Sequence, residues 1–364
     1  MEDVVIANSL ATFYRGKTVL VTGHTGFKGA WLSEWLKILG ARVIGFALPP
    51  NDQPNLFDAA HIGEAMSSVL GDLREFSAVR AVFEEHAPEI VFHNAAQPLV
   101  RRSYREPVTT YATNVMGTVH VLEAARNTSS VRAVVVVTSD KCYDNKDWLW
   151  GYREADPIGG RDPYSSSKGC AELVTAAYRH SFFHKNEGSA AVASARAGNV
   201  IAGGDWAEDR LVPDIVRSIS SGNTVVLRHP NAQRPWQYVL EPIRGYLMLG
   251  EFLGGGDHSY AQAWNFGPND EASISVSELA MRMIRFWGKG QLTVQPKEDD
   301  LHEAQYLKLD CSKAHAWLGW KPMLSIDESL QLTVEWYRNY LEDPQSAPRM
   351  TAKQIRDYMG RLKE

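Results

Sequence analysis

The first half of the chain alternates short runs of β-branched and apolar residues with longer stretches whose apolar positions recur at helical spacing. Such alternation is typical of a parallel sheet wrapped by helices. The pattern predicts strands at Thr18–Thr22, Arg42–Ala47, Ser68–Leu70, Glu89–His93 and Arg132–Thr138. The nearly unbroken apolar run at Ala133–Val137 indicates a strand that is buried on both faces.

Two helices stand out between these strands. Phe27–Leu39 places Trp31, Leu32, Trp35 and Leu36 on one face, which predicts an amphipathic helix packed against the sheet. A second helix is expected from Pro107 to about Arg126, because proline suits the first helical turn.

Beyond about residue 190 the alternation becomes irregular. Ala202–Trp206 has the composition of a loop, Trp236–Val239 that of a short strand, and Leu330–Tyr340 and Ala352–Leu362 that of aromatic-rich helices. We expect an α/β protein with a doubly wound parallel sheet and a smaller C-terminal α/β domain that closes over the strand ends. The predicted boundaries are 1–189, together with about 225–262, for the first domain, and 190–224 with 263–364 for the second.

Composition narrows the function classes. The 364 residues carry a formal net charge of −5, so we expect neither nucleic acid nor an anionic membrane as a partner. Three scattered cysteines, Cys142, Cys170 and Cys311, predict neither a disulfide framework nor a metal site. The first residues lack the pattern of a signal peptide, and no apolar run approaches the ~20 residues of a membrane span. We therefore expect a cytoplasmic protein.

A glycine-rich loop follows the first predicted strand and opens the first predicted helix. In Gly23-His24-Thr25-Gly26-Phe27-Lys28-Gly29 the glycines allow a tight turn, and the helix N-terminus favours an anion such as a pyrophosphate. This context predicts a Rossmann-type dinucleotide site. The second strand ends in Phe46-Ala47-Leu48-Pro49, with neither the acid that binds a ribose hydroxyl nor an arginine for a 2′-phosphate. The residues alone therefore leave NAD and NADP open.

Tyr164 and Lys168 are four positions apart on a segment with a helical pattern, so both can project from one face. A nearby ammonium would stabilise the phenolate and lower the tyrosine pKa, which suits removal of a proton from an alcohol. Ser139 lies 25 residues earlier at a predicted strand end and could bond the same hydroxyl. Asp140 and Lys141 add an acid and a base, more than alcohol oxidation requires.

The chain resembles the extended short-chain dehydrogenase/reductase superfamily over nearly its whole length. Besides the loop and the Tyr/Lys pair, the resemblance rests on Gly71–Leu73, His93–Ala96, Asn114–Thr118, Arg196 with Asn199, and Leu318–Pro322. Within the superfamily it is similar to nucleotide-sugar 4,6-dehydratases. The motifs that carry this narrower likeness are Ala96–Arg101, Thr138–Asn145, Trp150–Glu154 and Arg234–Gln237.

The resemblance implies bound NAD, a C-terminal nucleotide-sugar domain and a homodimer or homotetramer paired through helices. The residues it implies for the cofactor are Gly23, Thr25, Gly26, Phe27, Lys28, Gly29, Asp72, Leu73, Ala95, Ala96, Asn114, Tyr164 and Lys168. Lysine at 141, where related dehydratases commonly have glutamate, points to the branch that acts on CDP-glucose in deoxysugar (O-antigen-type) biosynthesis. We also expect His24 to crowd the pyrophosphate. For Asn114, helix packing and support of the site both remain open.

The same resemblance assigns roles in the reaction. Tyr164 would take the proton of the C4 hydroxyl, with Lys168 holding the phenolate and Ser139 bonding the C4 oxygen. Asp140 would protonate the departing C6 hydroxyl while Lys141 removes the C5 hydrogen. Because consecutive strand residues face opposite ways, this needs a turn at the strand end. The expected substrate contacts come from Asn199, Arg210, Arg234, Gln97 and Arg101, with a structural ion pair as an equal alternative for Arg101.

Three other classes of function remain compatible with the sequence. A nucleotide-sugar 4-epimerase or reductase needs Tyr164 and Lys168 but no acid/base pair for elimination. A 4,6-dehydratase could act on a different nucleotide hexose. A non-catalytic nucleotide-binding protein could keep the same fold, since fold does not fix function.

Overall fold

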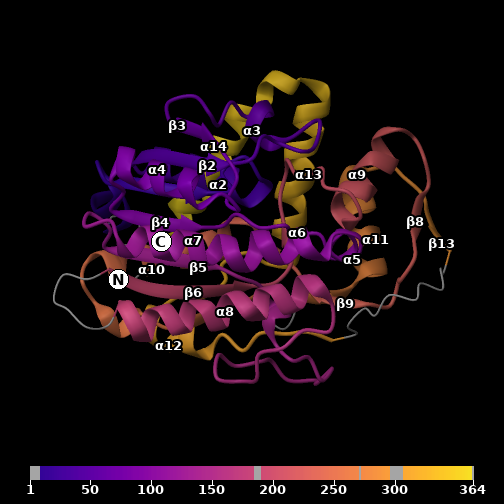
Figure 1. Ribbon diagram of the computed structural model, residues 1–364. Coiled ribbons are helices and arrows are strands. Elements are labelled where there is room, and N and C mark those ends of the chain that lie inside the picture. The colour runs from indigo at the N-terminus through magenta and orange to yellow at the C-terminus, as the bar shows by residue number, and fades with distance from the viewer. Residues whose placement is uncertain (1–8, 184–189, 270–271, 296–305, 363–364) are drawn as a thin grey trace.

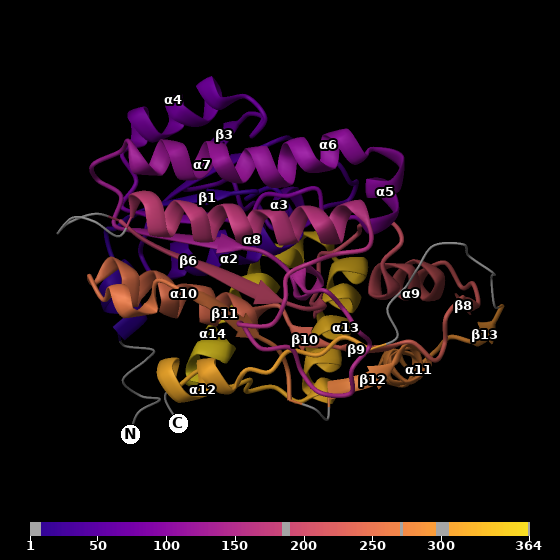
Figure 2. The ribbon, with the colours of Figure 1, turned by 60° about the horizontal axis from the view of Figure 1, so that its bottom comes forward.

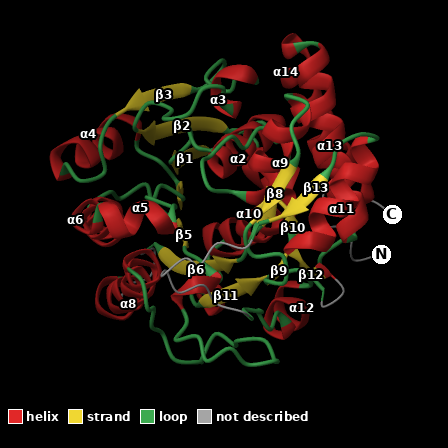
Figure 3. Ribbon diagram, turned by 90° about the vertical axis from the view of Figure 1, so that its right-hand side faces the viewer, coloured by secondary structure: helices red, strands yellow, loops and turns green. Residues whose placement is uncertain are grey.

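A seven-stranded parallel sheet organises the protein in this computed structural model, which describes residues 9–183, 190–269, 272–295 and 306–362. The strand order is β11-β6-β5-β4-β1-β2-β3 (Figure 3). The strands are β1 (Thr18–Thr22), β2 (Arg42–Ala47), β3 (Ser67–Leu70), β4 (Ile90–His93), β5 (Ala133–Val137), β6 (Ala191–Ala197) and β11 (Ala263–Phe266). From β1 the chain adds β2 and β3 on one side and then crosses to add β4 on the other side of β1. Ligands bind at such a switch point between neighbouring strands in doubly wound sheets. The predicted fold class is confirmed.

Side chains alternate between two hydrophobic cores, one on each face of the sheet. On β5, Val135 joins the core beneath α2 (Phe27–Ile38) and α10 (Leu240–Gly254), whereas Val134 and Val136 join the opposite core. That second core lies against α4 (Phe76–His86), α7 (Gly117–Arg126) and α8 (Pro163–Phe182). Figure 2 shows α7 and α8 side by side on one side of the sheet and α10 on the other. The two-sided burial predicted for β5 is confirmed.

The two predicted helices form, one of them in pieces. On α2, Trp31, Leu32, Trp35 and Leu36 are all fully buried, as expected. The helix predicted from Pro107 to about Arg126 consists of α6 (Pro107–Tyr111), a π-helical turn at Ala112–Met116, and α7. Such π turns are rare and occur often at functional sites.

A smaller lobe lies beyond the carboxyl ends of the strands, at the right of Figure 1. It contains α9 (Leu211–Ser220), β8 (Val225–Leu227), α11 (Val276–Trp287) and β13 (Leu292–Val294). Two shorter pairings form separate two-stranded sheets: β7 (Val200–Ile201) with β10 (Gln237–Tyr238), and β9 (Gln233–Pro235) with β12 (Ser273–Ser275).

One correction concerns the predicted boundaries. The ranges 190–224 and 263–364 were expected in the second domain, yet β6 and β11 belong to the main sheet. Ala193 on β6 pairs with Val135 of β5, and small alternating side chains let this strand fit between the two cores.

The C-terminal helices pack back onto the first half of the chain. α13 (Ile326–Glu342) and α14 (Ala347–Arg361) follow α12 (Ser312–Leu318), and α14 contacts α2. Two short helices, α3 (Leu56–Ala59) and α5 (Val100–Arg105), lie in the first half of the chain. In the part of the chain that the structure describes, no helix is long and apolar enough to span a bilayer.

Glu241 on α10 fastens this C-terminal segment. Its carboxylate accepts hydrogen bonds from Tyr358 Oη at 2.6 Å and from the main-chain N–H groups of Met323 and Leu324 at 2.9 and 2.8 Å. Burial raises the pKa of Glu241, and these donors oppose the rise.

Replacing Glu241 with alanine leaves these buried donors without their acceptor. We expect Glu241→Ala to lower the free energy of unfolding by about 3 kcal/mol. Chemical denaturation followed by circular dichroism measures the change. The exposed Glu342 on α13 provides the control, because Glu342→Ala should change stability by less than about 0.5 kcal/mol. Equal stability of the two variants would contradict the role given to Glu241.

Candidate active site

The glycine loop turns tightly between β1 and α2, beside the end of β4. Gly23 has φ +77°, and a Cβ there would lie 2.7 Å from Ala95 Cα, at the end of β4. A Cβ on Gly29 would lie 2.0 Å from Gly23 O. The exposed Gly26 caps α2 without a side chain, so the amide end of the helix is open to an anion. These residues fit the pyrophosphate of a dinucleotide.

The neighbouring predicted cofactor residues lie around this loop. Thr25 Oγ1 donates to Leu48 O at 2.8 Å, which ties the loop to the end of β2. Asp72 follows β3 and pairs with Arg74, whose hydrogen bonds lower the pKa of the carboxyl. Leu73 is buried in the core beneath α7. Their contacts with a cofactor remain predictions.

The His24 ring is turned into the protein. It has no exposed surface, and its Nε2 lies 2.7 Å from Ser68 Oγ. The ring packs over Gly45 of β2, where a Cβ would approach it to 2.3 Å. Burial lowers the pKa of His24 to about 4, so it is neutral at physiological pH. The prediction that His24 crowds the pyrophosphate is therefore wrong, because its ring points away from the loop into the protein.

The chain turns immediately after β5, as the predicted chemistry requires. Residues 138–143, here called the strand-end turn, contain a 3₁₀ turn at Asp140–Cys142. Ser139 Oγ accepts from Lys141 N at 3.2 Å and donates to Asp140 Oδ1 at 2.9 Å. Asp140 is buried, which raises its pKa, whereas Lys141 is half-buried. The turn brings an acid and an amine to the same strand end.

Tyr164 and Lys168 lie in the first two turns of α8, which Asp162 caps through Ser165 N at 2.9 Å. Lys168 Nζ donates to Val137 O at 3.3 Å, so the helix is held against the end of β5. Burial lowers the pKa of Lys168 to about 8.

The pKa of Tyr164 differs from the expectation. Burial raises it to about 12, while a hydrogen bond with the Ser139 side chain and the charge of Arg210 oppose the rise. The prediction that the lysine ammonium would lower this pKa below its usual value is wrong. The cause is desolvation of the phenolate, which the sequence does not reveal.

A buried ion pair connects the strand-end turn to α8. Arg196 Nη2 on β6 lies 2.8 Å from Glu172 Oε2, one turn after Lys168 on α8. Glu172 also accepts from Thr138 Oγ1 at 2.5 Å and Ser194 Oγ at 2.7 Å. Arg196 Nη1 donates to Tyr143 Oη at 2.7 Å. The pair therefore holds both ends of the strand-end turn.

Asn114 and Gln97 form a second polar link. Asn114 Nδ2, on the π-helical turn, donates to Ser167 Oγ of α8 at 2.8 Å, and Asn114 Oδ1 accepts from Gln97 N at 2.8 Å. The Gln97 side chain bonds Leu99 and Thr110 Oγ1. Asn114 thus supports the position of α8, whereas the predicted substrate contact of Gln97 remains a prediction.

The predicted substrate residues come from separate segments of the chain. Arg210 Nη1 pairs with Asp205 Oδ2 at 2.9 Å, and its charge acts on Tyr164. Arg234 is buried, and its charge opposes the rise that burial causes in the pKa of Asp140. Asn199 follows β6, and Arg101 is half-buried on α5. Arg210 and Arg234 therefore gather with the Tyr164 and Asp140 groups.

Sequence reasoning missed two residues. Glu172 is four positions after Lys168, a spacing that could have been noticed. Gly198 follows β6, and a Cβ there would lie 2.9 Å from Asp140 Oδ2. Glycine thus leaves room for the Asp140 carboxylate, but only the fold reveals this approach.

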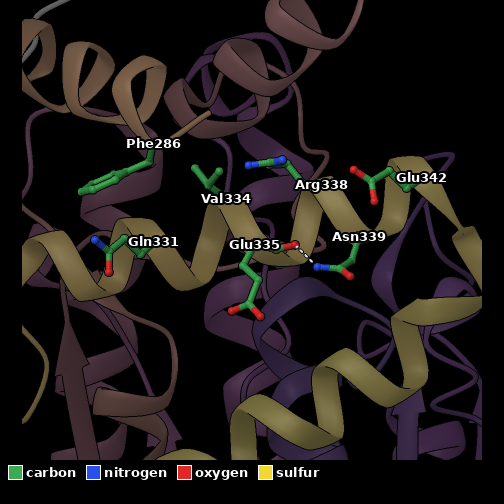
Figure 4. A pocket seen from close by; sticks show the side chains of 7 residues that line it. All are labelled: Phe286, Gln331, Val334, Glu335, Arg338, Asn339 and Glu342. Atoms are coloured by element: carbon green, nitrogen blue, oxygen red, sulfur yellow. Dashed lines mark hydrogen bonds between the residues drawn. The ribbon is translucent and has the colours of Figure 1, made fainter. Parts of the chain in front are cut away.

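A surface hollow lies away from the predicted site. It has a volume of about 230 Å³, sits between α11 and α13 and is lined by Phe286, Gln331, Val334, Glu335, Arg338, Asn339 and Glu342 (Figure 4). None of its lining residues belongs to the predicted site.

Comparison with known proteins agrees with the geometry. A CDP-glucose 4,6-dehydratase of Salmonella typhimurium is 49% identical over 351 residues, covering 96% of this chain and 98% of that protein. A dTDP-glucose 4,6-dehydratase of Xanthomonas campestris is 25% identical over 346 residues, covering 88% and 93%. A solved dTDP-glucose 4,6-dehydratase from Bacillus anthracis, in complex with NAD, shares the fold with a TM-score of 0.75 and 21% identity, covering 90% of this chain and 98% of that one.

The family model described as GDP-mannose 4,6-dehydratase matches residues 20–333, which include the glycine loop, the strand-end turn and the Tyr164/Lys168 pair. The chain belongs to the GDP-mannose 4,6-dehydratase family.

Proposed function

We propose that this protein is a CDP-glucose 4,6-dehydratase, which converts CDP-glucose to CDP-4-keto-6-deoxyglucose. One observation supports the reaction type: the strand-end turn carries Ser139, Asp140 and Lys141 in succession, its Ser139 side chain hydrogen-bonds Tyr164, and the charge of Asp140 acts on the same phenol. A 4-epimerase needs only the Tyr/Lys half of this cluster. The relative that is 49% identical over almost the full length supports cytosine as the base. The cytoplasmic location expected from the sequence stays a prediction.

The cofactor fits the glycine loop and the strand ends around it. The loop and the α2 N-terminus would hold the pyrophosphate, with Lys168 near the nicotinamide ribose. NAD supplies the chemistry that amino acid side chains lack, acceptance of a hydride from C4 and its return to C6. The solved relative from Bacillus anthracis was obtained in complex with NAD, which supports this choice.

The chain's own groups move the protons. Tyr164, bonded to Ser139, would take the proton of the C4 hydroxyl while Ser139 orients the C4 oxygen. The ketone formed at C4 makes the C5 hydrogen acidic. Burial raises the pKa of Asp140, which favours a protonated carboxyl able to donate to the departing C6 hydroxyl. Lys141, held by its main chain to Ser139, would remove the C5 hydrogen.

Turnover in heavy water tests this reaction. With CDP-glucose we expect a 4-keto-6-deoxy product that carries solvent deuterium at C5, detected by mass spectrometry and NMR. Tyr164→Phe should lower kcat by a factor of about 10²–10⁴, because the base is lost while the fold remains. UDP-, GDP- and dTDP-glucose should turn over more slowly than CDP-glucose. An epimerised product without deuterium at C5, or full activity of Tyr164→Phe, would refute the proposal.

Gly198→Ala tests the role of Asp140 separately from oxidation. The added Cβ presses on Asp140 Oδ2, so the elimination step should slow by about tenfold to a hundredfold, while oxidation at C4 is retained. Reduced nicotinamide should then accumulate in a single turnover, where its absorbance reports it. Gly360→Ala, at an open position, is the control. Equal slowing of both steps would contradict the assignment.

The homo-oligomer is also part of this proposal. Apolar side chains are exposed on the adjacent helices α5, α6 and α8, namely Tyr104, Val108, Tyr111 and Leu173. Such a patch suits pairing with a second copy about a two-fold axis.

A double variant, Val108→Arg with Leu173→Arg, should halve the molar mass measured by light scattering. The residues are 81% and 60% exposed, so the substitutions leave the core intact. Leu341→Arg, an exposed position on α13, should not change the mass. An unchanged mass in the double variant would exclude this face as the interface.

A further inference from the structure

Lys28 places a side-chain amine where the glycine loop meets the predicted catalytic groups. It lies in the first turn of α2, on one side of the sheet, whereas Lys168 lies on α8, on the other (Figure 3). Lys28 Nζ donates to Tyr246 Oη of α10 at 3.4 Å and lies 5.7 Å from the centre of that ring. The amine is thus held at the end of the sheet, next to the phosphate-binding loop.

The charges around Lys28 are mostly of its own sign. Lys168 of α8 and Arg210, which precedes α9, repel a proton on it, while Asp140 of the strand-end turn attracts one. Tyr164 and Tyr246 also face this cluster, and Asp205 pairs with Arg210. Burial, followed by the charges of these two cations, lowers the pKa of Lys28 to about 7, with Asp140 opposing the shift.

A diphosphate would reverse this balance. Its oxygens would bind at the α2 N-terminus, within the same turn that carries Lys28, and a nearby anion favours the charged form of an amine. The proposed function brings two diphosphates to this site, one in NAD and one in the nucleotide sugar. The position of Lys28 on the glycine-loop helix favours the cofactor.

We propose, on the basis of the proposed NAD-dependent function, that Lys28 gains a proton when the dinucleotide binds and its ammonium then contacts the cofactor pyrophosphate. Cofactor binding is therefore coupled to proton uptake. The sign follows from the lysine charge: the free amine is protonated below about pH 7, so affinity is highest there and falls as pH rises toward the higher pKa in the complex.

Calorimetric titration with NAD tests this coupling. The heats measured in two buffers of different ionisation enthalpy give the number of protons taken up. In the wild type we expect net uptake near pH 7.5 and an affinity that falls by about tenfold between about pH 6.5 and pH 8.5. Lys28→Arg keeps a permanent charge, so it should take up fewer protons and bind tightly over the whole range. Lys28→Met should bind weakly at low pH and match the wild type only at high pH.

The controls separate Lys28 from its neighbours. Lys168 is present in all these proteins, so the difference between wild type and Lys28→Arg belongs to Lys28. Lys37→Arg, on the same helix and paired with Glu34, should behave as the wild type. Equal proton uptake in wild type and Lys28→Arg, or uptake on adding CDP but not NAD, would overturn the inference. Failure of the wild type to bind NAD would instead refute the proposed cofactor.

Discussion

The buried ion pair between Glu172 and Arg196 is the interaction on which the arrangement of the site depends. It connects α8, which carries Tyr164 and Lys168, to β6 and, through Thr138 and Tyr143, to both ends of the strand-end turn. Both charges are almost completely buried, so losing one partner would leave the other unpaired, a change that costs about 3–5 kcal/mol in proteins. The Glu172 carboxylate thus fixes the position of the strand-end turn, with Ser139, Asp140 and Lys141, relative to α8, with Tyr164 and Lys168.

Charged side chains gather around this ion-paired framework. Lys168 and Arg210 lie near enough to Lys28 for their charges to lower its pKa. The Asp140 carboxyl opposes this effect. Burial lowers the pKa of both lysines, and for Lys28 the charges of Lys168 and Arg210 add to this effect. This group of cations suits the binding of diphosphates. The same burial raises the pKa of the Asp140 carboxyl and raises the pKa of Tyr164 to about 12. Desolvation thus favours the acid role proposed for Asp140.

Features encoded locally could be predicted from the sequence. The apolar run of β5, the amphipathic α2 and the spacing of Tyr164 and Lys168 each depend on neighbouring residues, and the structure shows the strand and both helices. Features that depend on distant contacts could not. The small residues of β6 gave no strong strand signal, and its place in the sheet comes from pairing with β5. The inward turn of His24, the raised pKa of Tyr164 and the approach of Gly198 to Asp140 depend on burial by segments far away in the chain.

Internal transfer of hydrogen tests the central claim, that one cluster at the strand ends oxidises C4, eliminates water and permits reduction at C6. The measurement uses CDP-glucose that carries deuterium at C4, with NMR of the product. We predict that the label appears at C6 of a 4-keto-6-deoxy sugar within the same molecule, because the hydride taken from C4 is returned to C6 before the product leaves. Label retained at C4 of an epimerised sugar, or released into free reduced cofactor, would contradict the account.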